Sequence, residues 1–308
     1  MMHMHIAASP LFGISPFVFW PYFAGTALTL IGLFAMRKEV TEARGVDKVL
    51  VTGPLFVAAA LAAFSADHFG LAKFIMADVP SWIPWHLFWA YFVGCALLAA
   101  ALSIATKIQV RLSATLLGIM IFSFVLTIHL PKVLAHPHDR IAWAVAVRDL
   151  SFAGGAWALA GTQTDEWRIH GTNKLIALGV FLMALAAVFF GVEHFLHPEY
   201  VPVVPLDKPM PAWFPGHILV AYLTGAVLIA AGVSLVLGIK ARAAATSLGV
   251  MVLILVLIVY LPIAIAIPSS AGTGEKIEGL NYFFDTLLFA GMVLVLANAL
   301  PRDARRVT

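Results

Sequence analysis

The chain has little charge and almost no cysteine, and each shortage excludes a class of protein. Only 11% of its 308 residues are charged, whereas soluble globular proteins carry about 25%, so a water-soluble globule is excluded. The one cysteine, Cys95, cannot form an internal disulfide, a CxxC redox pair or a cysteine zinc site. Walker loops, dinucleotide fingerprints, nucleophile elbows and HExxH motifs are missing as well. Enzymes that bind soluble-type cofactors through such motifs are therefore not expected.

Apolar sequence takes the place of charge. Hydrophobic residues make up 62% of the chain and the mean hydropathy is +0.96. Runs of about 20 apolar residues, each long enough to cross about 30 Å of hydrocarbon, recur along the sequence. They predict an all-α polytopic membrane protein with about nine transmembrane helices, at 11–36, 49–66, 86–106, 112–130, 141–161, 175–192, 214–238, 243–267 and 282–300. The lipid bilayer is thus the expected partner, and nucleic acid is not.

The positions of lysine and arginine predict how the helices cross the membrane. These residues are retained on the cytoplasmic side during insertion. Of the 19 basic residues, 13 fall in one set of alternate loops, five fall in the opposite set, and Arg148 lies within a helix. Residues 1–9 contain no lysine or arginine, so we expect no cleaved signal peptide and a retained first helix. Nine helices then place the N-terminus outside and the basic C-terminus in the cytoplasm.

An internal duplication sets the architecture. The segment PSWIPWH at 80–86 returns as PAWFPGH at 211–217, and the same spacing of 131 residues relates the Leu-Pro pairs at 130–131 and 261–262. A unit of four helices ends on the side where it began, so two copies form a parallel repeat. We expect one helix plus two parallel four-helix bundle repeats. The predicted divisions are an N-terminal helix and cytoplasmic loop (1–48), the first repeat (49–161), a cytoplasmic connector (162–174), the second repeat (175–301) and a basic tail (302–308).

Ionisable side chains gather where this topology places the outer ends of the helices. Arg148 lies about 10 Å from the outer start of its predicted helix. At such a depth in the bilayer, ionisable groups usually pair inside the bundle and by default mark a functional site. Because neighbours on a helix point about 100° apart, Arg148 and Asp149 are poor partners for each other. We expect Asp67 to pair with Arg148, and His68 or His129 to pair with Asp149.

The candidate binding residues come from both repeats, and no catalytic residue is assigned. They are Asp67, His68, His86, His129, Arg148 and Asp149 in the first repeat, and Glu193, His194, His217 and Asp285 in the second. The first repeat, or the seam between the repeats, is favoured because the second repeat has no counterpart of Arg148. Adjacent Asp-His or Glu-His residues do not share a helical face, so no metal site is predicted. Haem or metal ligation by histidine is the less favoured interpretation, and purely structural pairing of these groups stays open.

The first repeat resembles the DoxX-like membrane proteins. The resemblance rests on the helix that ends at Asp67-His68-Phe69, the proline-rich loop after it and the final helix that reads RDLSFAGG at 148–155. It covers 49–161 well and 175–300 more loosely. It implies a bacterial inner-membrane protein linked to redox work such as thiosulfate oxidation, with quinone as acceptor, other membrane or redox subunits as partners, and its polar pair at Arg148 and Asp149.

Three functions stay open at this point. The first is a redox-linked subunit that binds quinone or a small anion near the outer face, with Arg148 supplying positive charge and Asp149 or a histidine carrying the proton. The second is a transporter for a small solute or lipid, and the third is a non-catalytic structural subunit of a membrane complex. Whether the chain is an enzyme is left open.

Overall fold

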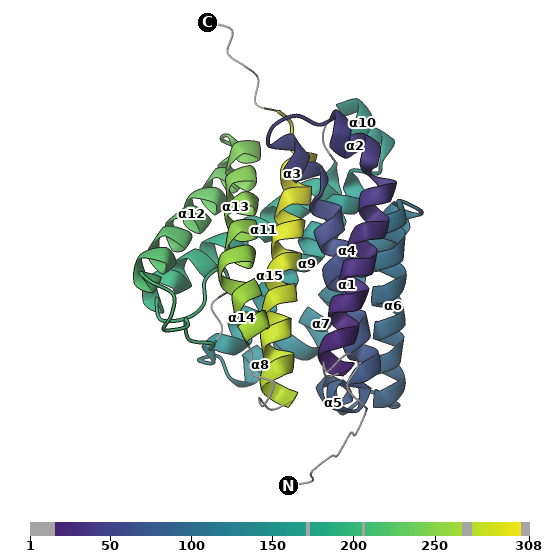
Figure 1. The fold of residues 1–308 in the computed structure, drawn as a ribbon, viewed down its shortest axis with the longest axis vertical. Helices are drawn as coiled ribbons and strands as arrows, with labels where there is room; N and C mark the ends of the chain where they lie inside the picture. The colour runs from purple at the N-terminus through teal and green to yellow at the C-terminus, as the bar shows by residue number, and fades with distance from the viewer. Residues whose placement is uncertain (1–15, 171–172, 205–206, 267–272, 303–308) are drawn as a thin grey trace, which may run out of the picture.

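The computed structural model describes residues 16–170, 173–204, 207–266 and 273–302 (Figure 1). These residues form helices and no strand, which confirms the all-α prediction. The long helical segments are α1 (Pro16–Ala35), α4 (Gly53–Gly70), α6 (His86–Thr106), α7 (Val110–Phe124) continued by η2 (Val125–His129) and α8 (Leu130–Ala135), α9 (Arg140–Gly161), α11 (Lys174–Leu196), α12 (His217–Leu237), α13 (Ala241–Leu255) continued by η3 (Val256–Tyr260) and α14 (Leu261–Ala266), and α15 (Thr273–Ala299). Short helices in the connections are α2 (Arg37–Glu42), α3 (Asp47–Val51), α5 (Ala72–Ile75), η1 (Met76–Asp78) and α10 (Asp165–His170).

Within the described part of the chain, eight of these segments are long and apolar enough to cross a membrane. The ninth, α9, falls short because Arg148 and Asp149 lie in its middle. The chain is therefore a multi-pass membrane protein. The expected start of the last helix, residue 282, is wrong: α15 begins at Thr273, because its polar first turns, which contain Glu275 and Lys276, are also helical.

The helices alternate in direction, so their ends form two groups at opposite ends of the molecule (Figure 1). The group at the lower end of Figure 1 contains Gly70 at the end of α4 and the starts of α6 and α12, which are His86 and His217; we call it the histidine end. The opposite group, the arginine end, contains the starts of α7 and α13 with Arg111 and Arg242.

The two repeats interlock. In each repeat the first helix packs against the second (α4 on α6, α11 on α12) and the third packs against the fourth (α7 on α9, α13 on α15). The first helix of each repeat also packs against the last helix of the other, so that α4 lies on α15 and α11 lies on α9. The two last helices, α9 and α15, meet at the centre of the molecule (Figure 1). Helix α1 has no counterpart and lies against α4 and α6.

Glycines at two crossings define which residues of the repeats correspond. A Cβ atom on Gly179 of α11 would lie 2.5 Å from the carbonyl oxygen of Gly154 in α9. In the same way, a Cβ atom on Gly53 of α4 would lie 3.1 Å from the carbonyl oxygen of Gly291 in α15. Small residues allow such close approach of helix backbones in a membrane. Gly154 thus corresponds to Gly291, and counting back along both helices, Arg148 corresponds to Asp285.

A proline shapes the third helix of each repeat in the same way. Pro131 and Pro262 carry no N–H group and cannot bond the carbonyl four residues earlier, which disturbs the helix there. Each proline is the second residue after a π-helical segment, η2 for Pro131 and η3 for Pro262. The wider turn places His129 at the end of η2 and Tyr260 at the end of η3. These two side chains face the last helices of their own repeats, and His129 reaches α9 in this way.

Candidate functional site

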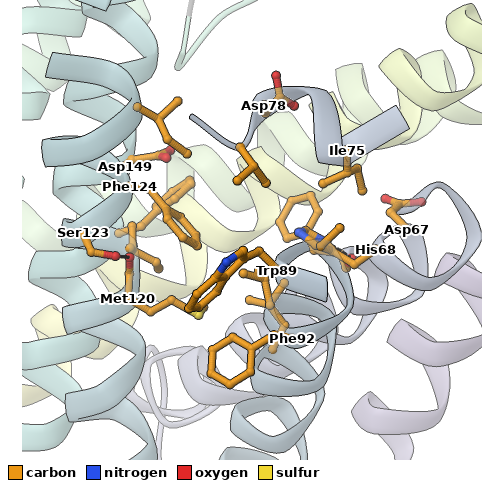
Figure 2. A pocket seen from close by; sticks show the side chains of 18 of the residues that line it. Asp67, His68, Ile75, Asp78, Trp89, Phe92, Met120, Ser123, Phe124 and Asp149 are labelled. Carbon is orange, nitrogen blue, oxygen red and sulfur yellow. Dashed lines mark hydrogen bonds between the residues drawn. The ribbon is translucent and has the colours of Figure 1, made fainter. Parts of the chain in front are cut away.

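A cavity of about 570 Å³ lies at the histidine end, between α4, α6, α7, α9 and α15 (Figure 2). We call it the first-repeat pocket, and most of its wall is apolar. In Figure 2 the His68 imidazole points into it from α4, and Ser123 and Phe124 lie on the opposite wall. The polar residues that line it are Asp67, His68, Asp78, Ser123, Thr127, Arg148, Asp149, Asn281 and Asp285.

The pocket reaches the apolar outer surface of the bundle. Trp89 and Phe92 of α6 line the cavity, and both side chains are also exposed on the outside of the molecule. Trp89 is fixed by a hydrogen bond of 3.0 Å from its indole N–H to the carbonyl oxygen of Pro84. Because α6 is a membrane-spanning helix, its exposed apolar side chains face lipid. An apolar ligand could therefore enter the pocket from the bilayer.

A chain of charged groups forms the back wall of the pocket. Arg148 donates hydrogen bonds from Nε to Oδ1 of Asp149 (2.9 Å) and from Nη1 to Oδ2 of Asp285 (2.7 Å). The other oxygen of Asp149, Oδ2, lies 2.9 Å from Nε2 of His129. All four side chains are less than one-fifth exposed. The guanidinium is thus shared by two carboxylates, and its charge is more than neutralised.

These pairs correct part of the sequence-based expectation. Asp67 as the partner of Arg148 is wrong, because Asp285 of the second repeat takes that place. The expectation that Arg148 and Asp149 do not pair is also wrong: the directions of their Cβ atoms differ, but the arginine side chain is long enough to turn back onto its neighbour. Of the two histidines predicted as partners of Asp149, His129 is the one that pairs with it, whereas His68 does not.

Asp67 is buried, and it forms no ion pair within the part of the chain that the structure describes. It is 6% exposed, and Oδ2 has no hydrogen-bond partner among the described residues. Its counterpart in the second repeat, Glu193, accepts a hydrogen bond of 3.0 Å from Arg140 at the start of α9. The glycine correspondence places Ile277 of α15, which lines the pocket, where α9 has Arg140. The missing partner of Asp67 is therefore a consequence of isoleucine at position 277.

The corresponding histidines His68 and His194 make the same contact through Nδ1 but different contacts through Nε2. His68 Nδ1 lies 2.8 Å from the carbonyl oxygen of Phe64, and His194 Nδ1 lies 2.6 Å from that of Phe190. His194 Nε2 accepts a hydrogen bond of 2.9 Å from the backbone N–H of Val203. His68 Nε2 has no such partner within the described ranges, and the ring lines the pocket.

Of the ten predicted site residues, five line the pocket: Asp67, His68, Arg148, Asp149 and Asp285. His129 stands directly behind Asp149, whereas Glu193 and His194 lie in the second repeat. His86 and His217 begin α6 and α12 and are not brought to this pocket. Sequence analysis missed four polar residues that line the pocket: Asp78, Ser123, Thr127 and Asn281. The spacing of four residues places Ser123 and Thr127 on one face of α7 and its continuation, and it could have revealed these two.

Comparison of the chain with protein-family models, with curated proteins and with solved structures finds no match. Among the described residues, no group of three or more histidine, cysteine, aspartate or glutamate side chains is placed to hold a metal ion.

Proposed function

We propose that this chain is a DoxX-like protein of the bacterial inner membrane whose first-repeat pocket binds a quinone or quinol as part of a redox-linked membrane complex. The observation that carries the proposal is the cavity of about 570 Å³ that joins the lipid-facing surface to a polar back wall. Its volume lies within the range of about 300–1,000 Å³ that ligand pockets occupy. Its aromatic and aliphatic lining suits a ring with an apolar tail, and its polar groups suit oxygen substituents.

The charges in the pocket favour such a ligand over a small anion. Arg148 is already bound by Asp149 and Asp285, and Asp67 and Asp78 add two more carboxyl groups to the lining. An anion would meet more negative than positive groups, which disfavours binding in a site of low dielectric. Protons released or taken up by a quinol headgroup, in contrast, have acceptors nearby in His68 and in the His129–Asp149 pair.

The other two functions have less support. A purely structural subunit would keep its buried polar groups paired and away from any cavity, but here a cavity reaches five of the candidate residues. Transporters usually carry broken helices near the middle of the membrane. In the described part of this chain, the irregular turns η2 and η3 lie toward the histidine end.

A binding experiment with a matched pair of variants tests the proposal. Ser123→Trp would fill the pocket, whereas Ile254→Trp places the same bulk at the corresponding, exposed position of α13. We expect a decyl-substituted benzoquinone to bind the wild type and Ile254→Trp equally, and to bind Ser123→Trp roughly tenfold or more weakly. Isothermal titration in detergent measures the affinities. Failure of the wild type to bind either this quinone or its hydroquinone, or undiminished binding to Ser123→Trp, would contradict the proposal.

We also propose that the histidine end faces away from the cytoplasm, as the distribution of basic residues predicts. The exposed residues Ser81 and Glu42 lie at the histidine end and the arginine end respectively. In a Cys95→Ala background, a membrane-impermeant maleimide should label Ser81→Cys in intact bacterial cells and label Glu42→Cys only after lysis. The reverse pattern would invert the topology.

A further inference from the structure

In the second repeat, the chain's own backbone occupies the place next to the histidine that is open in the first repeat. Residues 197–216 connect α11 to α12. Val201 and Val203 of this connection are fully buried, and Val204 is 4% exposed; all three belong to the main apolar core. We call residues 201–204 the plug. The corresponding connection in the first repeat instead forms α5 and η1, whose residues border the pocket.

Three hydrogen bonds hold the plug. The backbone N–H of Val201 donates to the carbonyl oxygen of Lys208 (3.0 Å), and the other two involve His194 and Tyr260. The backbone N–H of Val203 donates to His194 Nε2 (2.9 Å), and the carbonyl oxygen of Pro202 accepts a hydrogen bond from the Tyr260 hydroxyl. Val203 has a φ of +80°, a left-handed conformation that is rare for a β-branched residue and costs about 1–3 kcal/mol. The contacts of the plug therefore outweigh a local strain.

The tautomer of the histidines follows from their other ring nitrogen. A carbonyl oxygen can only accept a hydrogen bond, so Nδ1 of His68 and of His194 each donates to the carbonyl it faces. In the neutral ring the proton on Nδ1 leaves Nε2 as an acceptor. His194 uses this acceptor for the N–H of Val203. His68 presents the same acceptor to the pocket.

We infer that the ligand of the first-repeat pocket donates a hydrogen bond to His68 Nε2, as Val203 donates to His194, and that the pocket therefore selects a hydroxyl-bearing hydroquinone over its quinone or its ether. Because the plug fills the corresponding place in the second repeat, each chain binds one ligand. This inference rests on the proposed function and specifies which form of the ligand that site takes.

The cost of an unpaired acceptor sets the size of the expected difference in affinity. Burying an acceptor without a donor forfeits its hydrogen bonds with water, which costs enough to weaken binding by about fivefold to a hundredfold. A quinone offers only carbonyl oxygens, and a di-O-methyl ether offers only ether oxygens, so neither can satisfy His68 Nε2. The apolar lining of the pocket serves all three molecules equally.

Three matched probes test the inference under anaerobic conditions: a decyl-substituted benzohydroquinone, its quinone and its di-O-methyl ether. We expect wild-type protein in detergent to bind one hydroquinone per chain, about tenfold more tightly than the quinone or the ether. In His68→Phe, which keeps an aromatic ring and removes the acceptor, the three affinities should agree within about twofold. His86→Phe, at the start of α6 and outside the pocket lining, should keep the wild-type preference.

The possible outcomes separate the two proposals. Equal binding of the three probes to the wild type would overturn the inference and leave the proposed function standing, and this result does not depend on whether His68→Phe folds. Two hydroquinones per chain would show that the plug does not close the second repeat and would also overturn it. If no probe binds the wild type, the proposed function fails and the inference fails with it.

Discussion

Arg148 and Asp285 occupy corresponding positions of the two repeats and carry opposite charges. Each is less than one-fifth exposed, and each bonds the other across the centre of the molecule. A buried ion pair of this kind adds little stability compared with apolar residues, but removal of one partner leaves an uncompensated charge. Loss of either residue alone should therefore cost more stability than the intact pair contributes.

Loss of Arg148 should be strongly destabilising. In Arg148→Met, Asp285 loses its bonded cation and Asp149 keeps only His129, so we expect the free energy of unfolding to fall by about 3–5 kcal/mol. Unfolding in detergent with increasing dodecyl sulfate measures this change. The double variant Arg148→Met/Asp285→Leu, which removes both charges of the pair, should recover a large part of the loss. A double variant as unstable as the single one would contradict this account.

The two corresponding carboxyl groups Asp67 and Glu193 should respond in different ways to replacement by an amide. Oδ2 of Asp67 has no partner among the residues that the structure describes, so Asp67→Asn should leave the free energy of unfolding unchanged or raise it slightly. Glu193 binds Arg140, so Glu193→Gln should lower it by about 2 kcal/mol. The same unfolding titration compares the two variants, and equal losses would show that Asp67 also has a stabilising partner.

At the scale of elements, close helix crossings depend on glycine. Gly179→Ala places a methyl group 2.5 Å from the carbonyl oxygen of Gly154, and a backbone atom cannot move aside as a flexible side chain can. We expect a loss of about 1–3 kcal/mol in the free energy of unfolding. Ala177→Leu adds bulk to the exposed side of the same helix and should change it by less than about 0.5 kcal/mol. Equal effects of the two changes would mean that this crossing is not tightly packed.

The helical elements could be predicted from the sequence, whereas their pairing could not. The length of an apolar run predicts whether a segment can cross the bilayer, so eight of the nine long helices in the described residues are recognised by composition alone. The partner of Arg148 is different, because Asp285 becomes its neighbour only when α15 packs against α9. His129 was within reach of sequence reasoning, since it lies in the same repeat as Asp149 and at the same depth.

The pocket could not be predicted from the sequence either. It depends on how the connection after α4 folds, and the first repeat forms α5 and η1 where the second forms the plug. The second connection, 197–216, is longer and richer in proline than 71–85, but both contain buried hydrophobic residues such as Leu71 and Val201, so these differences do not predict which one fills its site. Only the contacts of His68 and His194 show that one site is open and the other is filled.

At the scale of the whole molecule, each repeat buries part of its surface against the other repeat. Helix α4 packs against α15, and α11 packs against α9. We expect fragments 1–166 and 167–308, divided in the connector, to be degraded when expressed alone and to copurify when expressed together. Affinity purification of one tagged fragment, followed by detection of the other, measures the association. A first fragment that is stable and monomeric by itself would show that the interlocking contacts are dispensable.

The contact between the last helices of the two repeats, α9 and α15, has a further consequence for assembly. Two copies of the first repeat, joined as the repeats are joined here, would set Arg148 against another Arg148, and two copies of the second would set Asp285 against another Asp285. Like charges buried at contact distance repel strongly. A first repeat is therefore expected to associate with a second repeat and not with another copy of itself. The fusion of both repeats in one polypeptide supplies them in the one-to-one ratio that this pairing requires.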